Sequence, residues 1–96
     1  MLILITYDVN TETADGRKRL RKIAKECVNY GQRVQNSVFE CEIDNALWLK
    51  VRHKLENIID KEIDSLRFYY LGDSKKAKRE HIGCKPSLDM NGILIM

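Results

Sequence analysis

Residues 1–9 read MLILITYDV, a run of apolar residues that ends near a single carboxylate, Asp8. The length of the run and its content of Ile and Leu predict a central strand that is covered on both faces. A charged group at the end of a buried strand needs a charged partner, a hydrogen bond, a metal ion or water. A rigid strand also holds a functional side chain in place. Asp8 is therefore the first candidate functional residue of the chain.

The segment that follows has the spacing of an amphipathic helix over residues 17–30. A polar loop precedes this helix at residues 10–16, and Gly31 stands where a glycine often ends a helix. The predicted apolar face consists of Leu20, Ile23, Ala24, Cys27 and Tyr30. The opposite face carries five cations, which are Arg17, Lys18, Arg21, Lys22 and Lys25.

The middle of the chain predicts two short strands and a second helix. Residues 33–43 alternate with a period of two, and a tight turn or a bulge is expected at residues 36–37. A helix should follow over residues 44–60, because Asp and Asn at its start are good N-caps. Its predicted core-facing stripe is Leu47, Trp48, Val51, Leu55, Ile58 and Ile59. Residues 65–71 complete the pattern as a further strand.

The predicted order is βαββαβ, which consists of two similar halves. With right-handed crossovers this order gives a ferredoxin-like α+β fold, a four-stranded antiparallel sheet with both helices on one face. We expect one domain over residues 1–96, with the core in residues 1–72 and a basic loop and C-terminal dimerisation tail in residues 73–96. The uncovered face of the sheet should be covered by that tail or by a second copy of the chain.

The composition describes a folded protein whose charge is unevenly distributed. Of the 96 residues, 44% are hydrophobic and 32% charged, which argues against disorder. Residues 1–36 hold seven Lys and Arg against four Asp and Glu, residues 37–66 hold four against seven, and residues 67–96 hold six against three. Any anion-binding surface must therefore be assembled by folding from separate basic segments.

The three cysteines and the N-terminal segment indicate the compartment. Cys27, Cys41 and Cys84 are an odd number without CxxC spacing, so we expect reduced thiols that pack as small apolar residues. The N-terminal apolar run is too short to span a bilayer and lacks the basic leader of a signal peptide. These features predict a cytoplasmic protein.

Cations on the first predicted helix suggest a nucleic-acid contact. They repel one another unless an anion is near, and phosphate backbones are bound by such charges without base readout. A second basic cluster consists of Lys75, Lys76, Lys78 and Arg79. The alternative is that both clusters are simply solvated. Tyr7 and Phe39 are expected to pack in the core, and neither His53 nor His81 has a companion at a metal-ligand spacing.

Four stretches together resemble the CRISPR-associated protein two family: residues 1–9, 17–21, 31–41 (GQRVQNSVFEC) and 70–72 (YLG). The resemblance implies a ferredoxin-like homodimer in which the C-terminal segment of each subunit pairs with the sheet of the other. It implies a role in CRISPR spacer acquisition, in which the dimer bridges copies of a larger integrase subunit and holds the incoming DNA. It also implies a metal-dependent endonuclease that acts on single-stranded RNA or double-stranded DNA.

The same resemblance implies functions for individual residues. Asp8 matches the metal-binding carboxylate of the family, and Tyr7, Arg17, Arg33 and Phe39 match positions of its active region. In a two-fold dimer a residue near the axis meets its own copy, so two Asp8 side chains could share one Mg²⁺ or Mn²⁺ ion. The alternative from the residues alone is that Asp8 caps the following loop or accepts backbone hydrogen bonds.

Three functions remain open at this point. The first is the CRISPR adaptation homodimer with metal-dependent endonuclease activity, and it is the function we predict. The second is a scaffold that holds DNA without cleaving it, in which Asp8 is dispensable. The third is a small-molecule-sensing dimer of similar fold, which should have an apolar pocket at its interface instead of a phosphate-binding surface.

Overall fold

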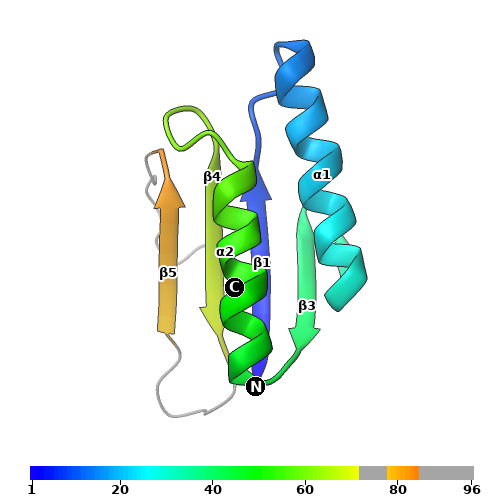
Figure 1. Cartoon of the computed structure of the whole chain (residues 1–96), viewed down its shortest axis with the longest axis vertical. Helices are drawn as coiled ribbons and strands as arrows, with labels where there is room; N and C mark the ends of the chain where they lie inside the picture. Colours follow the sequence, from blue (N-terminus) through cyan, green and yellow to red (C-terminus); the bar gives the residue numbers. More distant parts are fainter. Residues whose placement is uncertain (72–77, 85–96) are drawn as a thin grey trace.

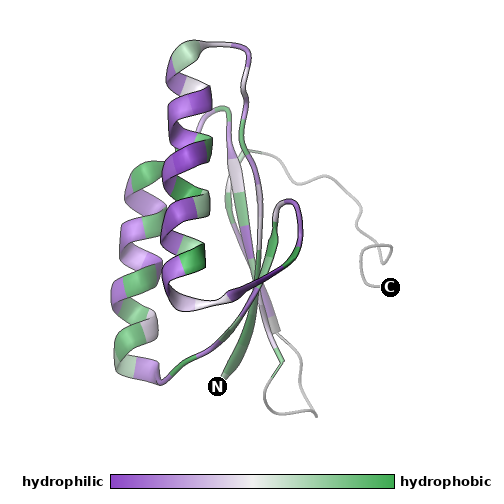
Figure 2. Cartoon of the chain, turned by 90° about the vertical axis from the view of Figure 1, so that its right-hand side faces the viewer, coloured by the Kyte–Doolittle hydropathy of each residue, from purple (hydrophilic) through white to green (hydrophobic). Residues whose placement is uncertain are grey.

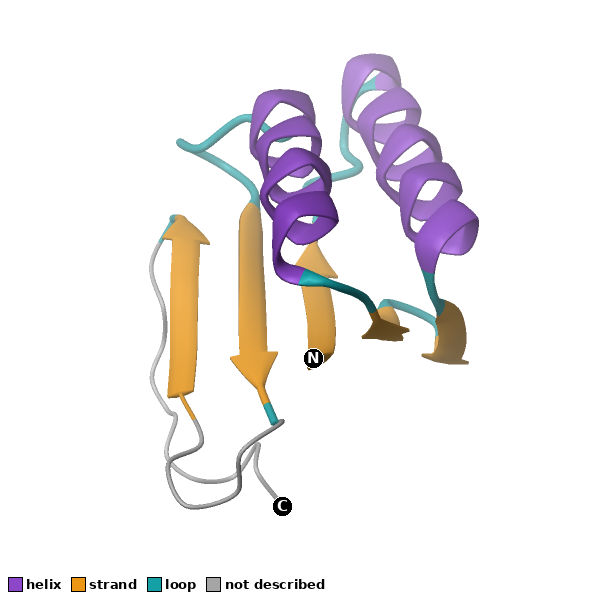
Figure 3. Ribbon diagram, turned by 60° about the horizontal axis from the view of Figure 1, so that its bottom comes forward, coloured by secondary structure: helices purple, strands orange, loops and turns teal. Residues whose placement is uncertain are grey.

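A computed structural model describes residues 1–71 and 78–84 of the chain, and it has the predicted α+β architecture (Figure 1). Five antiparallel strands form one sheet in the order β2-β3-β1-β4-β5, and both helices lie on the same face of it (Figure 3). The elements are β1 (Leu2–Asp8), α1 (Ala14–Tyr30), β2 (Gln32–Gln35), β3 (Val38–Glu42), α2 (Asn45–Ile58), β4 (Ser65–Tyr70) and β5 (Lys78–Gly83). The ferredoxin-like prediction is confirmed, with one strand more than expected.

Strand β1 lies at the centre of the sheet between β3 and β4, as its apolar sequence predicted. Its side chains alternate, so that Ile3, Ile5 and Tyr7 are buried under the helices. Leu4 and Asp8 belong to the other set, on the face of the sheet that carries no helix, which we call the open face. The two helices cover only one face of β1 (Figure 2), and the tail or second copy expected to cover the other face lies outside the described residues.

Helix α1 starts earlier than predicted because Thr13 caps it. The Thr13 hydroxyl accepts a hydrogen bond from the N–H of Gly16 at 3.0 Å, which satisfies one of the free donors of the first turn. Gly31 ends the helix, as predicted, but in an extended conformation with φ of −146°. A side chain at this position would approach both Cys41 Sγ and the carbonyl oxygen of Glu40 to 2.7 Å, so lack of space is what requires glycine.

Helix α2 begins where the sequence predicted. The Asp44 carboxylate accepts a hydrogen bond from the N–H of Leu47 at 2.8 Å. The predicted stripe is correct at its centre, because Trp48, Val51 and Leu55 are almost fully buried. It is wrong for Leu47, which is 37% exposed because it lies on the flank of the helix.

Within the described residues, no helix is both long and apolar enough to cross a membrane.

Strand β5 was not predicted as a strand. Lys78 and Arg79 were expected in a basic loop, but they pair with Tyr70 and Tyr69 of β4 in the same chain. The strand is held against α2 and β4 by Glu80, whose carboxylate accepts hydrogen bonds of 2.7 Å from both Arg52 and the Tyr70 hydroxyl. Residues 72–77 and 85–96, which contain Lys75, Lys76 and most of the expected dimerisation tail, lie outside the described residues.

The three cysteines are free thiols, as predicted. Cys27 and Cys41 are fully buried between α1 and the sheet, and Cys84 is partly exposed. Burial is the main cause that raises the pKa of Cys27 to about 12. The Cys27 thiol therefore stays protonated at neutral pH and acts as a small apolar side chain.

Candidate functional site

Asp8 is the last residue of β1 and its side chain is exposed at the end of the sheet. It lies opposite Ser65 of β4 and has the same parity along the strand as Leu4 and Thr6, which line the open face. The hydrogen bonds and ion pairs of the described residues leave the Asp8 carboxylate without a partner. The alternative in which Asp8 caps the following loop or accepts backbone hydrogen bonds is not found in residues 1–71 and 78–84, where the N–H of Glu12 donates to Asn10 and that of Gly16 to Thr13 instead.

Asp8 is the one residue that the resemblance marks as a metal ligand, and no further metal-binding side chains gather around it in the described residues. Residues 1–71 and 78–84 contain no group of three or more His, Cys, Asp or Glu that could hold a metal ion. Mg²⁺ is held through one or two carboxylates and keeps water molecules or substrate phosphate oxygens as its other ligands. A single exposed carboxylate does not make a closed zinc site, and it could contribute at most one protein ligand to a magnesium ion.

Tyr7 lies on the opposite face of β1 from Asp8, where it is 6% exposed. Its ring is nearly parallel to that of Phe39 with the centroids 6.2 Å apart, and its hydroxyl donates to the Asn36 carbonyl oxygen at 3.4 Å. Burial is the main cause that raises the pKa of Tyr7. The prediction that Tyr7 packs in the core is confirmed, and its hydroxyl stays protonated at neutral pH.

Phe39 supports Arg33 across the hairpin of β2 and β3. Phe39 is fully buried, as predicted for a core residue, and pairs with Arg33 in the strand register. The guanidinium carbon of Arg33 lies 4.9 Å from the centre of the Phe39 ring, a cation–π contact that holds the exposed arginine in place. The turn of this hairpin lies beside the end of β1, since the N–H of Tyr7 donates to the Ser37 carbonyl oxygen at 3.1 Å.

The predicted cationic face of α1 is present. All five of its members are exposed, and no ion pair of the described chain involves any of them: Arg17, Lys18, Arg21, Lys22 and Lys25. Arg17 donates to the Thr11 carbonyl oxygen at 3.2 Å. Within the second basic cluster, Lys78 and Arg79 belong to β5, at the far edge of the sheet from α1 (Figure 1). The described parts of the two clusters are therefore not brought together within one chain.

Asp64 is a buried carboxylate that the sequence reasoning missed. It accepts hydrogen bonds from Arg19 Nε at 2.7 Å and from the N–H groups of Asn10 and Asp60 at 2.9 Å each. Burial would raise the pKa of Asp64, but these hydrogen bonds outweigh it and lower the pKa. The signal was present in the helical spacing, because Arg19 stands four residues before the buried Ile23 and hence on the inner side of α1.

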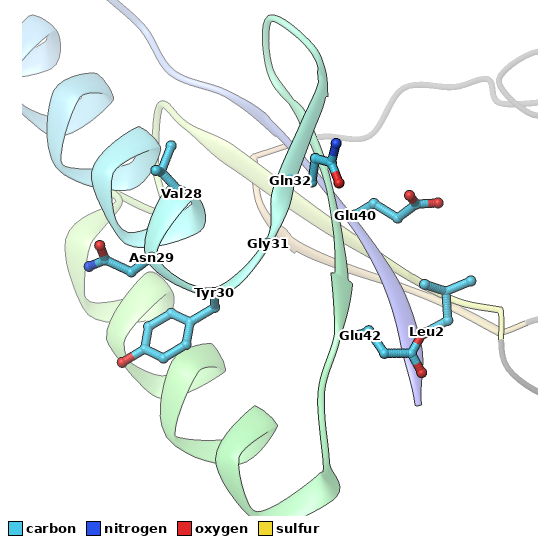
Figure 4. Close-up of a pocket in the computed structure, with 8 residues that line it drawn as sticks. All are labelled: Leu2, Val28, Asn29, Tyr30, Gly31, Gln32, Glu40 and Glu42. Carbon is cyan, nitrogen blue, oxygen red and sulfur yellow. The ribbon is translucent and has the colours of Figure 1, made fainter.

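A groove of about 530 Å³ crosses the open face of the sheet. Its lining residues are Leu4, Thr6, Val34, Gln35, Val38, Arg67, Tyr69 and Leu71. A second pocket of about 380 Å³ lies where α1 leads into β2 (Figure 4). Glu40 and Glu42 line this pocket, so its charge disfavours a phosphate, whereas the groove of the open face is lined by Arg67 and by no carboxylate. The open face is therefore the better candidate, although neither pocket is lined by a predicted site residue.

Comparison with known proteins agrees with the sequence resemblance and the fold. The model of the family "CRISPR associated protein Cas2" matches residues 1–79. A protein of Chlorobaculum tepidum named CRISPR-associated endoribonuclease Cas2 is 59% identical over 96 residues, which cover both chains completely. One of Halalkalibacterium halodurans, named CRISPR-associated endonuclease Cas2, is 58% identical over 95 residues, which cover 99% of each chain.

The fold also matches a solved structure of this family. The crystal structure of Cas2 from Streptococcus pyogenes has a TM-score of 0.70 and 61% sequence identity to this chain. The match covers 77% of this chain and 89% of the other. Since the family model matches most of the sequence, and relatives match it from end to end, this chain belongs to the Cas2 family of CRISPR-associated proteins.

Proposed function

We propose that this chain is a CRISPR adaptation protein that binds nucleic acid as a homodimer and cleaves phosphodiester bonds in a metal-dependent reaction. The observation that carries the proposal is the exposed Asp8 carboxylate, which the central strand presents at the end of the open face and which has no partner within residues 1–71 and 78–84. The names of the relatives support it, because they are called endoribonuclease or endonuclease. The substrate is single-stranded RNA or double-stranded DNA.

The open face supports the proposed dimer. An uncovered sheet face with an apolar groove is a typical contact surface, and Leu4, Val38 and Tyr69 contribute to the one described here. In a two-fold dimer through this face each Asp8 belongs to the surface that meets its own copy. The C-terminal segment of each subunit then pairs with the sheet of the other.

In the proposed reaction, a water oxygen forms a bond to phosphorus and loses a proton to solvent, while the bond from phosphorus to the leaving oxygen breaks and that oxygen takes up a proton from solvent. Asp8, alone or together with its copy, would hold Mg²⁺ or Mn²⁺. Such an ion supplies positive charge at the phosphate and makes a water molecule more acidic. Arg17 and Arg33, which lie on the helix side of the sheet, bind phosphate oxygens around the end of β1, while Tyr7 and Phe39 position Arg33 from the core.

The cationic surfaces of the dimer serve spacer integration. The exposed face of α1 binds the phosphate backbone of DNA without base readout, together with the basic residues Lys75, Lys76, Lys78 and Arg79. The dimer then bridges copies of the larger integrase subunit. The second candidate function is this scaffold role alone, and it is favoured by the single carboxylate, which is a sparse donor set for catalysis.

The deciding experiment compares wild type with Asp8→Ala for cleavage of single-stranded RNA and double-stranded DNA in Mg²⁺ and in Mn²⁺. Glu62→Gln is the matched control, since Glu62 is an exposed carboxylate whose side chain makes no described contact. The proposal expects cleavage by wild type and the control, and none by Asp8→Ala. Equal cleavage by all three proteins would identify a contaminant, and no cleavage by any of them would leave the DNA-holding scaffold.

A further inference from the structure

Arg67 of β4 and Asp8 of β1 belong to the same face of the sheet, the open face. In the register of β1 and β4, Thr6 is opposite Arg67 and Asp8 is opposite Ser65. Asp8 and Arg67 are therefore diagonal neighbours, whose backbones are about 7–8 Å apart in an antiparallel sheet and within reach of a long side chain. The same groove contains both Thr6 and Arg67, which places the arginine on the face of the sheet that Asp8 also belongs to.

His81 orients the Arg67 guanidinium. Arg67 Nε lies 3.1 Å from His81 Nδ1, and His81 Nε2 lies 2.7 Å from the carbonyl oxygen of Cys84. A carbonyl oxygen can only accept, so Nε2 must carry the hydrogen and donate it, and Nδ1 is then free to accept from Arg67. Cys84 is itself fixed, because its N–H donates to the Asp64 carbonyl oxygen at 2.9 Å. The neutral imidazole therefore holds the arginine from a rigid support.

The charge of Arg67 is not neutralised within the described chain. Arg19 and Arg52 both form ion pairs with carboxylates, at 2.7 and 2.9 Å respectively, whereas none of the described ion pairs involves Arg67. His81 accepts a hydrogen bond only from the Nε–H group of Arg67. In residues 1–71 and 78–84 no acceptor is recorded for the two terminal nitrogens of the Arg67 guanidinium. A half-buried guanidinium with two free, parallel donor groups is suited to a phosphate.

We propose that Arg67 is a further catalytic residue of this protein, which binds the phosphate that Asp8 helps to place, and that His81 is its positioning residue. This inference rests on the proposed endonuclease function. Negative charge grows on the phosphate oxygens as the water oxygen bonds to phosphorus. Donors that are already aimed at those oxygens stabilise the transition state more than the ground state. Arg67, held by His81 of the neighbouring strand β5, supplies two such donors on the same face of the sheet as Asp8.

The test compares Arg67→Gln with Lys50→Gln in the full chain, with single-stranded RNA and double-stranded DNA as probes. Lys50→Gln removes the same charge from an exposed position of α2, on the other side of the sheet. We expect Arg67→Gln to lower kcat/KM by about 10- to 100-fold, mainly through kcat, which is the loss expected for one charge-assisted donor in a transition state. Lys50→Gln should remain within about twofold of wild type.

Two variants of His81 separate positioning from simple packing. His81→Asn keeps an acceptor close to the place of Nδ1, whereas His81→Leu fills a similar space without one. We expect the Asn variant to recover most of kcat and the Leu variant to resemble Arg67→Gln, at equal thermal midpoints. Equal loss of activity in both variants would overturn the positioning role.

Failure of this inference and failure of the proposed function give different results. If wild type cleaves, Asp8→Ala does not, and Arg67→Gln matches the Lys50→Gln control, then Arg67 is not catalytic although the nuclease is real. If wild type does not cleave, both the nuclease and the role of Arg67 are overturned. Sedimentation of Arg67→Gln tests whether Arg67 acts through the dimer contact. If the variant dissociates and regains full activity at high protein concentration, its defect lies in assembly and the catalytic role is overturned.

Discussion

The ion pair between Arg19 and Asp64 ties three parts of the chain together next to the candidate site. Asp64 directly precedes β4, Arg19 belongs to α1, and Asn10, whose N–H also donates to Asp64, follows β1 by two residues. The Asp64 side chain is fully buried and that of Arg19 is 17% exposed. The pair therefore fixes the segment that leaves Asp8, although it does not face the open side of the sheet.

Replacing Asp64 should destabilise the protein. Asp64→Ala leaves the Arg19 charge and the N–H groups of Asn10 and Asp60 without their acceptor in a water-poor site. We expect the free energy of unfolding to fall by about 3 kcal/mol. Urea denaturation followed by circular dichroism measures it, and Glu62→Ala, at an exposed position, should change it by less than about 0.5 kcal/mol. A similar small change for Asp64→Ala would show that the pair contributes little.

The same carboxylate should make stability depend on acid. The pKa of Asp64 is lowered in the folded protein from its ordinary value of 3.8, so the folded state releases the Asp64 proton more readily than the unfolded chain does. The stabilisation by the Asp64 carboxylate is complete when the pH is above the pKa of Asp64 in the unfolded chain. It is lost as the pH falls towards the lower pKa of Asp64 in the folded protein. Urea titrations between pH 3 and pH 7 should show a steeper loss of stability below about pH 4 in wild type than in Asp64→Asn. Parallel curves would contradict the assignment.

Between the elements, the junction of α1 and β2 depends on one glycine. Gly31 brings the end of the helix against β3, where an added methyl group would meet Cys41 Sγ and the Glu40 carbonyl oxygen. Gly31→Ala should lower the free energy of unfolding by about 1–3 kcal/mol, because overpacking forces the two elements apart. In the double variant Gly31→Ala/Cys41→Ala only the contact with Glu40 remains. Chemical denaturation of the variants, with Cys41→Ala alone as the reference, should show partial recovery, and a double variant that is no better than additive would contradict this cause.

For the whole molecule, the open face should govern assembly. Leu4 lines its groove, and Leu49 is an equally apolar residue that is 58% exposed on α2. We expect Leu4→Glu to turn the proposed dimer into a folded monomer, because it places a charge in an apolar contact, whereas Leu49→Glu stays dimeric. Sedimentation equilibrium distinguishes the two states. A dimeric Leu4→Glu protein would place the interface elsewhere.

The cationic face of α1 should govern the salt dependence of nucleic-acid binding. Each cation that contacts a phosphate releases counterions, so the double variant Arg17→Glu/Arg21→Glu should bind duplex DNA more weakly and reduce the slope of log affinity against log salt concentration by about 2. Fluorescence anisotropy over a series of salt concentrations measures both quantities. The double variant Lys50→Glu/Lys61→Glu, at exposed positions outside α1, is the control. The same slope in both variants would mean that α1 is not the contact.

Most of the fold was accessible from the sequence because its determinants are local. The spacing of apolar residues predicted both helices, and the caps at Asp44 and Gly31 were recognisable as single residues. Strand β5 escaped prediction because its sequence is polar and its pairing with β4 is decided by distant partners such as Arg52. For the same reason Leu47 was assigned to the core, since a periodic pattern does not show how far the buried stripe extends.

By itself, the sequence determined the family, the order of the elements and Asp8 as the candidate residue, because these depend on composition, spacing and short motifs. Only the tertiary structure decided which face each residue occupies. It placed Asp8 on the open face and Tyr7 and Phe39 beneath the helices, and it separated Lys78 and Arg79 from the cations of α1. It also paired Arg19 with Asp64 and placed Arg67 on the same face as Asp8, since contacts between residues that are far apart in the chain form only when the strands align.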